Sequence, residues 1–156
     1  KNFELTMKLK FIICGIAAIA ATGFQASADV LTDAFEAVKY IGGAMIEDTP
    51  EQQLHEQGID AATVALSQEA TASSETATDS ICNAIPAEYS IADVNDDEAN
   101  VKVFKVDNGE KSRMLVYVNG MENGKKMIVV VLMEGNKESL EVNMDGGNFS
   151  IGKRKN

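Results

Sequence analysis

The sequence has no tryptophan, one histidine, two cysteines and two prolines among its 156 residues. Without tryptophan there is no aromatic platform for a sugar, so the many carboxylates give no support for a glycosidase. One histidine and two separated cysteines cannot form a Cys/His cluster with zinc spacing. His55 and Cys82 are a pair that could act in nucleophilic catalysis, but no neighbouring residue orients them. We therefore expect a protein that is not an enzyme.

Glycines and acidic residues are present, but not in the patterns that bind phosphate or calcium. Gly42-Gly43 and Gly146-Gly147 lack the spacing of a phosphate-binding loop. Residues 93–97 begin like a calcium loop, but Glu98 and Phe104 stand where such a loop needs a glycine and a closing glutamate. We interpret this stretch as an acidic turn between strands. The sequence thus predicts no catalytic residue, no metal and no cofactor.

The start of the sequence has the pattern of a secretory leader. Residues 7–28 combine two lysines, an apolar stretch over Phe11–Gly23 and the small-x-small triplet Ala26-Ser27-Ala28. The apolar stretch is too short for a comfortable membrane span, and no other segment approaches about 20 apolar residues. We expect residues 1–28 to be a pre-start segment plus a signal peptide that is cleaved after Ala28. The remaining chain is then exported and has no membrane span.

The predicted cleavage removes three lysines and one glutamate, which leaves 11 basic and 23 acidic residues. Sixteen of these acids and a single base lie in residues 29–98, whereas residues 99–156 hold ten bases and seven acids. The acidic front half argues against nucleic acid as a partner. Because the cleaved chain keeps only Cys82, it forms no internal disulfide. Apolar neighbours favour a buried thiol there over an exposed thiol that pairs with another molecule.

Two apolar runs around a polar connection, within Arg113–Met133, predict an antiparallel hairpin. The side chains of the second run alternate between two apolar faces, with Met127, Val129, Val131 and Met133 on one face and Ile128, Val130 and Leu132 on the other. Such a strand belongs in the middle of a sheet that is covered on both faces. Alternatively, one face is a surface for an oligomer or another partner. Lys125, Lys126 and Glu134 flank this aggregation-prone run with charge.

Helical patterns precede the hairpin. Apolar residues at spacings of three and four predict a helix over Asp29–Ile46, which Gly42-Gly43 loosens or ends. A second short helix is predicted over Thr49–Gly58, with Pro50 in its first turn. Residues 61–80 are rich in alanine, threonine, serine and glutamate, so we expect a mobile loop or a frayed helix there.

Further strands are predicted around the hairpin. Tyr89–Val94 and Val101–Val106 precede it, and Leu140–Met144 follows it with the alternation of an edge strand. Helices first and strands afterwards indicate an α+β fold. We expect one domain over residues 29–156, with N-terminal helices packed on one face of a C-terminal antiparallel meander of four to five strands.

Several of these strand patterns resemble a known family. Tyr89, the run Val94-Asn95-Asp96-Asp97, Val101–Phe104, Met114–Val118 and Asp145-Gly146 are similar to the small secreted proteins of the domain-of-unknown-function 4252 family, from Gram-negative gut bacteria. The resemblance covers mainly residues 89–146. It implies an exported α+β protein of a Gram-negative bacterium, located in the periplasm or at the cell surface. It implies no activity and no functional residues.

Together these patterns favour an exported, non-enzymatic binding or interaction module of unknown ligand. A homodimer through one face of the two-sided strand is one form of such an interaction. An alternative is a small periplasmic inhibitor or sensor component that docks a protein partner through its acidic N-terminal half. An enzyme that uses Cys82 and His55 is a third hypothesis.

Overall fold

The computed structural model describes residues 30–39, 41, 45–48, 58–95, 97, 99–145 and 148–152. The predicted leader, the predicted helix over Thr49–Gly58 up to residue 57, and His55 lie outside these residues. The elements in chain order are α2 (Val30–Lys39), β1 (Met45–Asp48), β2 (Ile59–Ser67), α4 (Ala72–Asn83), the 3-10 turn η1 (Ala87–Tyr89), β3 (Ser90–Asn95), β4 (Ala99–Asn108), β5 (Lys111–Glu122), β6 (Lys125–Asn136), β7 (Glu141–Asp145) and β8 (Asn148–Gly152).

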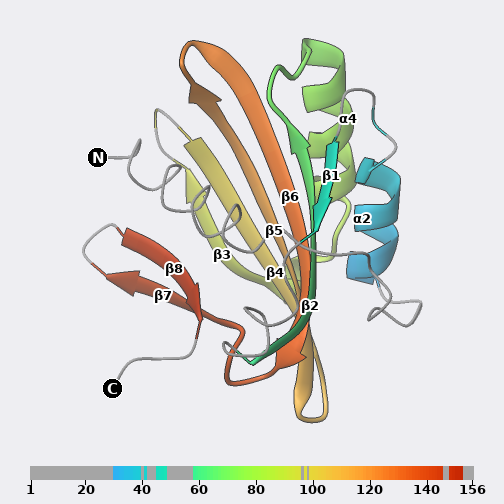
Figure 1. Ribbon diagram of the computed structural model, residues 1–156, viewed down its shortest axis with the longest axis vertical. Helices are drawn as coiled ribbons and strands as arrows, with labels where there is room; N and C mark the ends of the chain where they lie inside the picture. The colour runs from blue at the N-terminus through green and yellow to red at the C-terminus, as the bar shows by residue number, and fades with distance from the viewer. Residues whose placement is uncertain are drawn as a thin grey trace.

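An antiparallel sheet of six strands, in the order β1-β2-β6-β5-β4-β3, forms the centre of the fold (Figure 1). The predicted meander is present in β3 to β6, where each strand pairs with the next one in the chain. The α+β class is therefore confirmed. The meander has four strands, within the predicted four to five, and β1 and β2 extend the same sheet beyond β6, which was not predicted.

The β5–β6 hairpin is the predicted hairpin, and it is longer than the two apolar runs. Its strands pair from Lys111 with Asn136 to Glu122 with Lys125. Asn123 and Gly124 form the two-residue turn with φ angles of 52° and 76°. Positive φ at both positions is what the tight turn of a twisted hairpin requires, and asparagine and glycine adopt it most readily. The local sequence thus sets the register of the central strands.

Both faces of the hairpin are buried, as the sequence predicts. One face packs against α2 and α4, and we call its residues the helix-face core: Leu31, Ala34, Phe35, Val38, Ala65, Cys82, Ile85, Phe104, Leu115, Tyr117, Ile128, Val130 and Leu132. The opposite face we call the valine–methionine face: Val64, Val101, Val103, Met114, Val116, Val118, Met127, Val129, Val131 and Met133. Figure 1 shows both helices on one side of the sheet and the β7–β8 hairpin on the other.

Residues 61–80, for which the sequence predicts a mobile loop or a frayed helix, form a strand in their first part and a helix in their second. The first part lies in β2, where Ala61 to Leu66 are all buried and pair with β6. The second part lies in α4, which begins with a capping box between Thr71 and Ser74. Alanine and threonine side chains bury little area each, but they fill space beside the bulky residues of β6 and below the helices. Tertiary packing therefore orders a composition that alone favours disorder.

The predicted helix over Asp29–Ile46 was too long, because α2 ends at Lys39 and Met45–Asp48 forms β1. Leu31, Phe35 and Val38 form the buried stripe of α2, at the predicted spacing. The glycines after Tyr40 have a low helix propensity, which is consistent with a break before β1. Helices and strands are therefore interleaved in the front half.

The prediction that Leu140–Met144 is an edge strand of the main sheet was also wrong. Glu141–Asp145 forms β7, which pairs with β8 in a separate two-stranded sheet. Leu140, at the turn before β7, is fully buried against the valine–methionine face. The alternation correctly predicted a strand here, but this strand pairs with β8 and not with a strand of the six-stranded sheet. In the described part of the chain, no helix is long and apolar enough to cross a membrane.

Candidate functional site

A group of polar side chains lies where α4 meets the sheet, and we call it the α4 polar cluster: Glu75, Asp79, Tyr117, Asn119 and Lys126. Tyr117 and Asn119 project from the helix side of β5. The Tyr117 hydroxyl donates a hydrogen bond to Asp79 Oδ1. Asn119 Nδ2 donates to Glu75 Oε2 over 2.8 Å and to the Tyr117 hydroxyl over 3.2 Å. Lys126 Nζ lies 2.7 Å from Glu75 Oε2. These contacts hold two successive turns of α4 against β5 and β6.

The charges in this cluster are set by its hydrogen bonds and by burial. Lys126 and Asn119 donate to Glu75 and lower the pKa of its carboxyl below the ordinary 4.5. Burial, together with the hydrogen bond to Asp79, raises the pKa of Tyr117 above its ordinary value of 10.0. Tyr117 therefore stays protonated and acts as a donor. The carbonyl oxygen of the Asn119 side chain is buried without a hydrogen-bond partner.

The Glu75 carboxylate should make folding stability depend on acid pH. Its pKa is lower in the folded chain than in the unfolded chain, so the ionised form stabilises the fold above about pH 4.5. That contribution is lost as the pH falls through the folded-state pKa. In Glu75→Gln we expect the free energy of unfolding to be lower by up to about 1 kcal/mol near neutral pH. The difference from wild type should be smaller at acid pH, as the carboxyl becomes protonated through its lowered folded-state pKa.

Urea unfolding of both proteins at the two pH values measures this effect. Glu110→Gln is the matched control, because Glu110 is exposed in the β4–β5 turn. An equal loss of stability in Glu75→Gln at both pH values would show that the carboxylate charge is not responsible.

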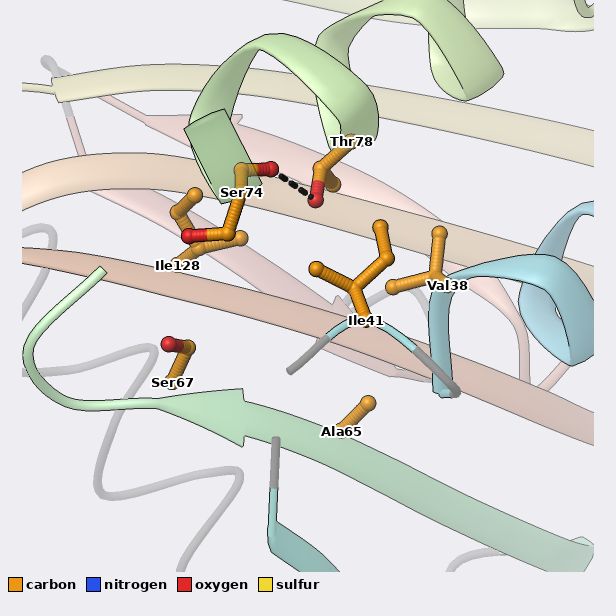
Figure 2. Close-up of a pocket in the computed structure, with 7 residues that line it drawn as sticks. All are labelled: Val38, Ile41, Ala65, Ser67, Ser74, Thr78 and Ile128. Carbon is orange, nitrogen blue, oxygen red and sulfur yellow. Dashed lines mark hydrogen bonds between the residues drawn. The ribbon is translucent and has the colours of Figure 1, made fainter. Parts of the chain in front are cut away.

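A shallow hollow lies beside the cluster, between the end of α2, α4 and strand β2 (Figure 2). Its volume is about 260 Å³, part of which is open to solvent. Apolar side chains and three hydroxyl-bearing residues surround it: Val38, Ile41, Ala65, Ser67, Ser74, Thr78 and Ile128. The Thr78 hydroxyl donates to the Ser74 carbonyl over 2.8 Å, and the Ser74 hydroxyl donates to the Thr71 carbonyl over 3.0 Å. The enclosed part has room for about one water molecule, so the hollow is too small for a typical ligand.

Cys82 is fully buried in the helix-face core. Burial, with a smaller effect of Asp79, raises the pKa of its thiol from 9.0 to about 12. The thiolate is the reactive form of cysteine, so this thiol is a poor nucleophile. Of the two alternatives from the sequence, the buried structural thiol is confirmed. His55 lies outside the described residues, and the structure gives no test of its distance from Cys82.

A thiol-directed reagent provides a simple check on Cys82. At a pH near 8, a shift from 9.0 to about 12 lowers the thiolate fraction about a thousandfold. In a Cys14→Ser chain, which leaves Cys82 as its one thiol, we expect no labelling of the native protein during the time that labels the denatured protein completely. Rapid labelling of the native protein would contradict both the burial and the raised pKa.

Residues 93–97 do not form a described metal site. Asp93 and Asn95 are exposed residues of β3, and Asp93 lies opposite Lys102 in the β3–β4 register. Asp97 is exposed after the strand, while Asp96 and Glu98 lie outside the described residues. Among the residues that the structure describes, no group of three or more His, Cys, Asp or Glu side chains could hold a metal ion.

The charged residues that flank the second apolar run have partners on neighbouring segments of the chain. Lys125 forms an ion pair with Glu69, and Lys126 forms its pair with Glu75. Glu134 accepts hydrogen bonds from Arg113 at 3.1 Å and 2.7 Å. Each flanking charge thus ends the apolar run and also connects β6 to a neighbouring element.

Arg113 joins α2 to the two central strands. It is 9% exposed, and besides its two bonds to Glu134 it donates from Nη1 to the Thr32 hydroxyl over 3.0 Å. Two bonds from one guanidinium to one carboxylate give this ion pair a fixed geometry. Sequence reasoning did not identify this contact or the α4 polar cluster, because both join residues that are far apart in the chain.

The chain was compared with protein-family models, with curated proteins and with solved structures. No protein-family model, no curated protein and no solved structure matches the chain.

Proposed function

We propose that this chain is an exported, non-enzymatic binding module, built on a rigid sheet and acting at the periplasm or cell surface of a Gram-negative bacterium. The observation that supports it is that two potentially reactive side chains between α4 and the sheet, those of Cys82 and Tyr117, serve in structural contacts. The Cys82 thiol is buried with a raised pKa, and the Tyr117 hydroxyl donates to Asp79. Groups held in this way stabilise the fold and are poorly suited to act as nucleophile or base. The leader pattern of residues 7–28 supports export.

A second candidate function is a small inhibitor or sensor component that docks a basic protein through acidic side chains of the front half. Exposed carboxylates on described elements favour it. Asp33 and Glu36 are exposed on α2, Glu88 is exposed in η1, and Asp93 is exposed on the outer strand β3. Exposed charges at the edge of a protein–protein interface increase the association rate and make binding sensitive to salt.

Capture of a partner tests both candidates. The exported chain is immobilised and incubated with envelope extract at low and at raised salt. The binding module predicts specific capture of a partner that an unrelated acidic protein does not capture. The docking alternative further predicts loss of capture at raised salt and in a Glu88→Lys, Asp93→Lys variant, with Glu110→Lys, Glu138→Lys as the control of equal charge change, because both control residues are exposed outside the front half. If nothing is captured specifically, both proposals are contradicted.

A further inference from the structure

The outer edge of β3 is unpaired. β3 is the last strand of the six-stranded sheet, and its partner in that sheet is β4 (Figure 1). Among the described residues, no backbone group outside β4 bonds to residues 91–95. Every second residue of such a strand directs its N–H and C=O away from the neighbouring strand. β3 therefore presents backbone donors and acceptors that another extended chain can bind.

The side chains of β3 are also accessible in the complete chain. Asp93 and Asn95 are exposed, and Ile91 is 46% exposed. Ala92 and Val94, which alternate with them, are half-buried and pack against the valine–methionine face. The strand is thus held by the core through one face and is open to solvent on the other.

The charge around this edge has one sign. Residues 86–98 contain five acids and no base. Glu88, Asp93 and Asp97 are exposed, and none of the three forms an ion pair with a described residue. Lys102 lies opposite Asp93 in the register, but its Nζ donates to the side-chain oxygen of the last residue of α4 over 2.6 Å. The edge therefore keeps a negative charge that a basic partner complements.

We propose that the outer edge of β3 binds an extended, basic segment of another protein, which pairs with β3 and adds a strand to the sheet. The inference rests on the proposed binding function and names its site and the kind of partner. In strand addition, main-chain hydrogen bonds supply affinity and alternating side chains supply specificity. A lysine or arginine opposite Asp93 forms a cross-strand pair of opposite charge. An aliphatic side chain of the partner covers the exposed Ile91.

A second copy of this chain fits the same edge poorly. When two β3 strands pair antiparallel about Asp93, the two carboxylates lie opposite each other, and like charges in such positions are destabilising. The bulge between Ser90 and Ala92 also interrupts regular pairing at the start of the strand. Regular pairing is then limited to Ala92–Asn95, which favours a weak and reversible contact. A basic segment avoids the charge repulsion, whereas a second copy does not.

Fluorescence anisotropy with a synthetic peptide tests the proposal. The probe is a short, capped, fluorescein-labelled peptide in which lysine alternates with valine, and the protein is the exported chain. At low salt we expect saturable binding, which weakens at raised salt because added ions screen the exposed charges. A peptide that is N-methylated on all its backbone nitrogens has the same charge but no amide donor, so it should bind at least about tenfold more weakly. Equal binding of the two peptides would show charge attraction alone and overturn strand addition.

Two neutralised carboxylates provide a variant of the protein that keeps its surface shape. Glu88→Gln, Asp93→Asn should weaken binding of the unmodified peptide at least about threefold. Glu110→Gln, Glu138→Gln is the matched control with the same change of charge at exposed residues away from β3, and it should bind as wild type does. An equal loss in both variants would show that net charge, and not this edge, attracts the peptide.

Nuclear magnetic resonance locates the bound peptide on the sheet. Titration should shift the amide signals of Ala92–Asn95 and slow the exchange of alternate amides with solvent, while the signals of β1, at the other end of the sheet, stay unchanged. Shifts at β1 without shifts at β3 would overturn the proposal, and so would the absence of binding at low salt. Partner capture from envelope extract is measured separately. Capture that succeeds where the peptide fails retains the proposed binding function and removes β3 as its site.

Discussion

Replacing Leu115 with alanine is expected to lower the free energy of unfolding by about 3–4 kcal/mol. Leu115 is fully buried in the helix-face core, in the middle of β5 between β4 and β6. The substitution removes apolar contacts and leaves a cavity, because the strands on either side fix the backbone and limit relaxation. Urea unfolding followed by circular dichroism measures the change. The same truncation at an exposed residue, Ile91→Ala, should change stability by less than about 0.5 kcal/mol.

The result also tests whether the helices truly cover this face. If α2 and α4 were loosely attached, Leu115→Ala would leave its neighbours free to collapse or to admit water, and the loss would approach that of the exposed control. A value below about 1 kcal/mol would therefore contradict the packing of the helix-face core.

Replacing Arg113 with methionine is expected to lower the free energy of unfolding by about 2–3 kcal/mol. The change removes the guanidinium that donates to the Glu134 carboxylate and to the Thr32 hydroxyl. Removing one partner of a fully buried ion pair typically costs about 3–5 kcal/mol. We expect a smaller value, because the Glu134 side chain is 23% exposed and water can partly replace the guanidinium. Methionine keeps most of the apolar stem, so lost packing contributes little.

A double-mutant cycle separates the ion pair from the rest of the effect. Glu134→Gln alone should cost less than Arg113→Met, and the double variant should be more stable than the sum of the single losses implies. Hydrogen exchange adds a local readout, since α2 amides should exchange faster in Arg113→Met while β4 amides stay protected. Additive single losses, with α2 unchanged, would show that the Glu134 ion pair does not hold Arg113 in place against Thr32 of α2.

The central hairpin was predictable because its information is local. Two alternating apolar runs and the Asn123-Gly124 turn specify strand, register and both buried faces within residues 111–136. β2 and α4 were missed for the opposite reason. Residues 61–80 carry small and polar side chains whose local preference is weak, and contacts with β6, up to about 70 positions later in the chain, decide their structure. The alternation of Leu140–Met144 predicted a strand, but nothing local in the sequence indicated that this strand would pair with β8.

The candidate site was even less accessible to sequence reasoning. The α4 polar cluster joins Glu75 and Asp79, one turn apart on a helix, with Tyr117, Asn119 and Lys126 on two strands. Only one signal was present in the sequence, namely a tyrosine and an asparagine two positions apart on the same side of an apolar strand. Buried polar groups need partners, so this spacing predicts that something polar covers them. It does not say which residues provide the cover.

The pairing of β2 with β6 has a consequence for how the protein is made. The ribosome releases the N-terminal part first, so β2 leaves it roughly 60 residues before the strand that it will border. Until then β2 has only the four residues of β1 to pair with, and its edge toward β6 is unpaired, whereas β3 to β6 can pair one after another. The edge of β2 that faces β6 is therefore open to pairing with another chain until β6 has been made.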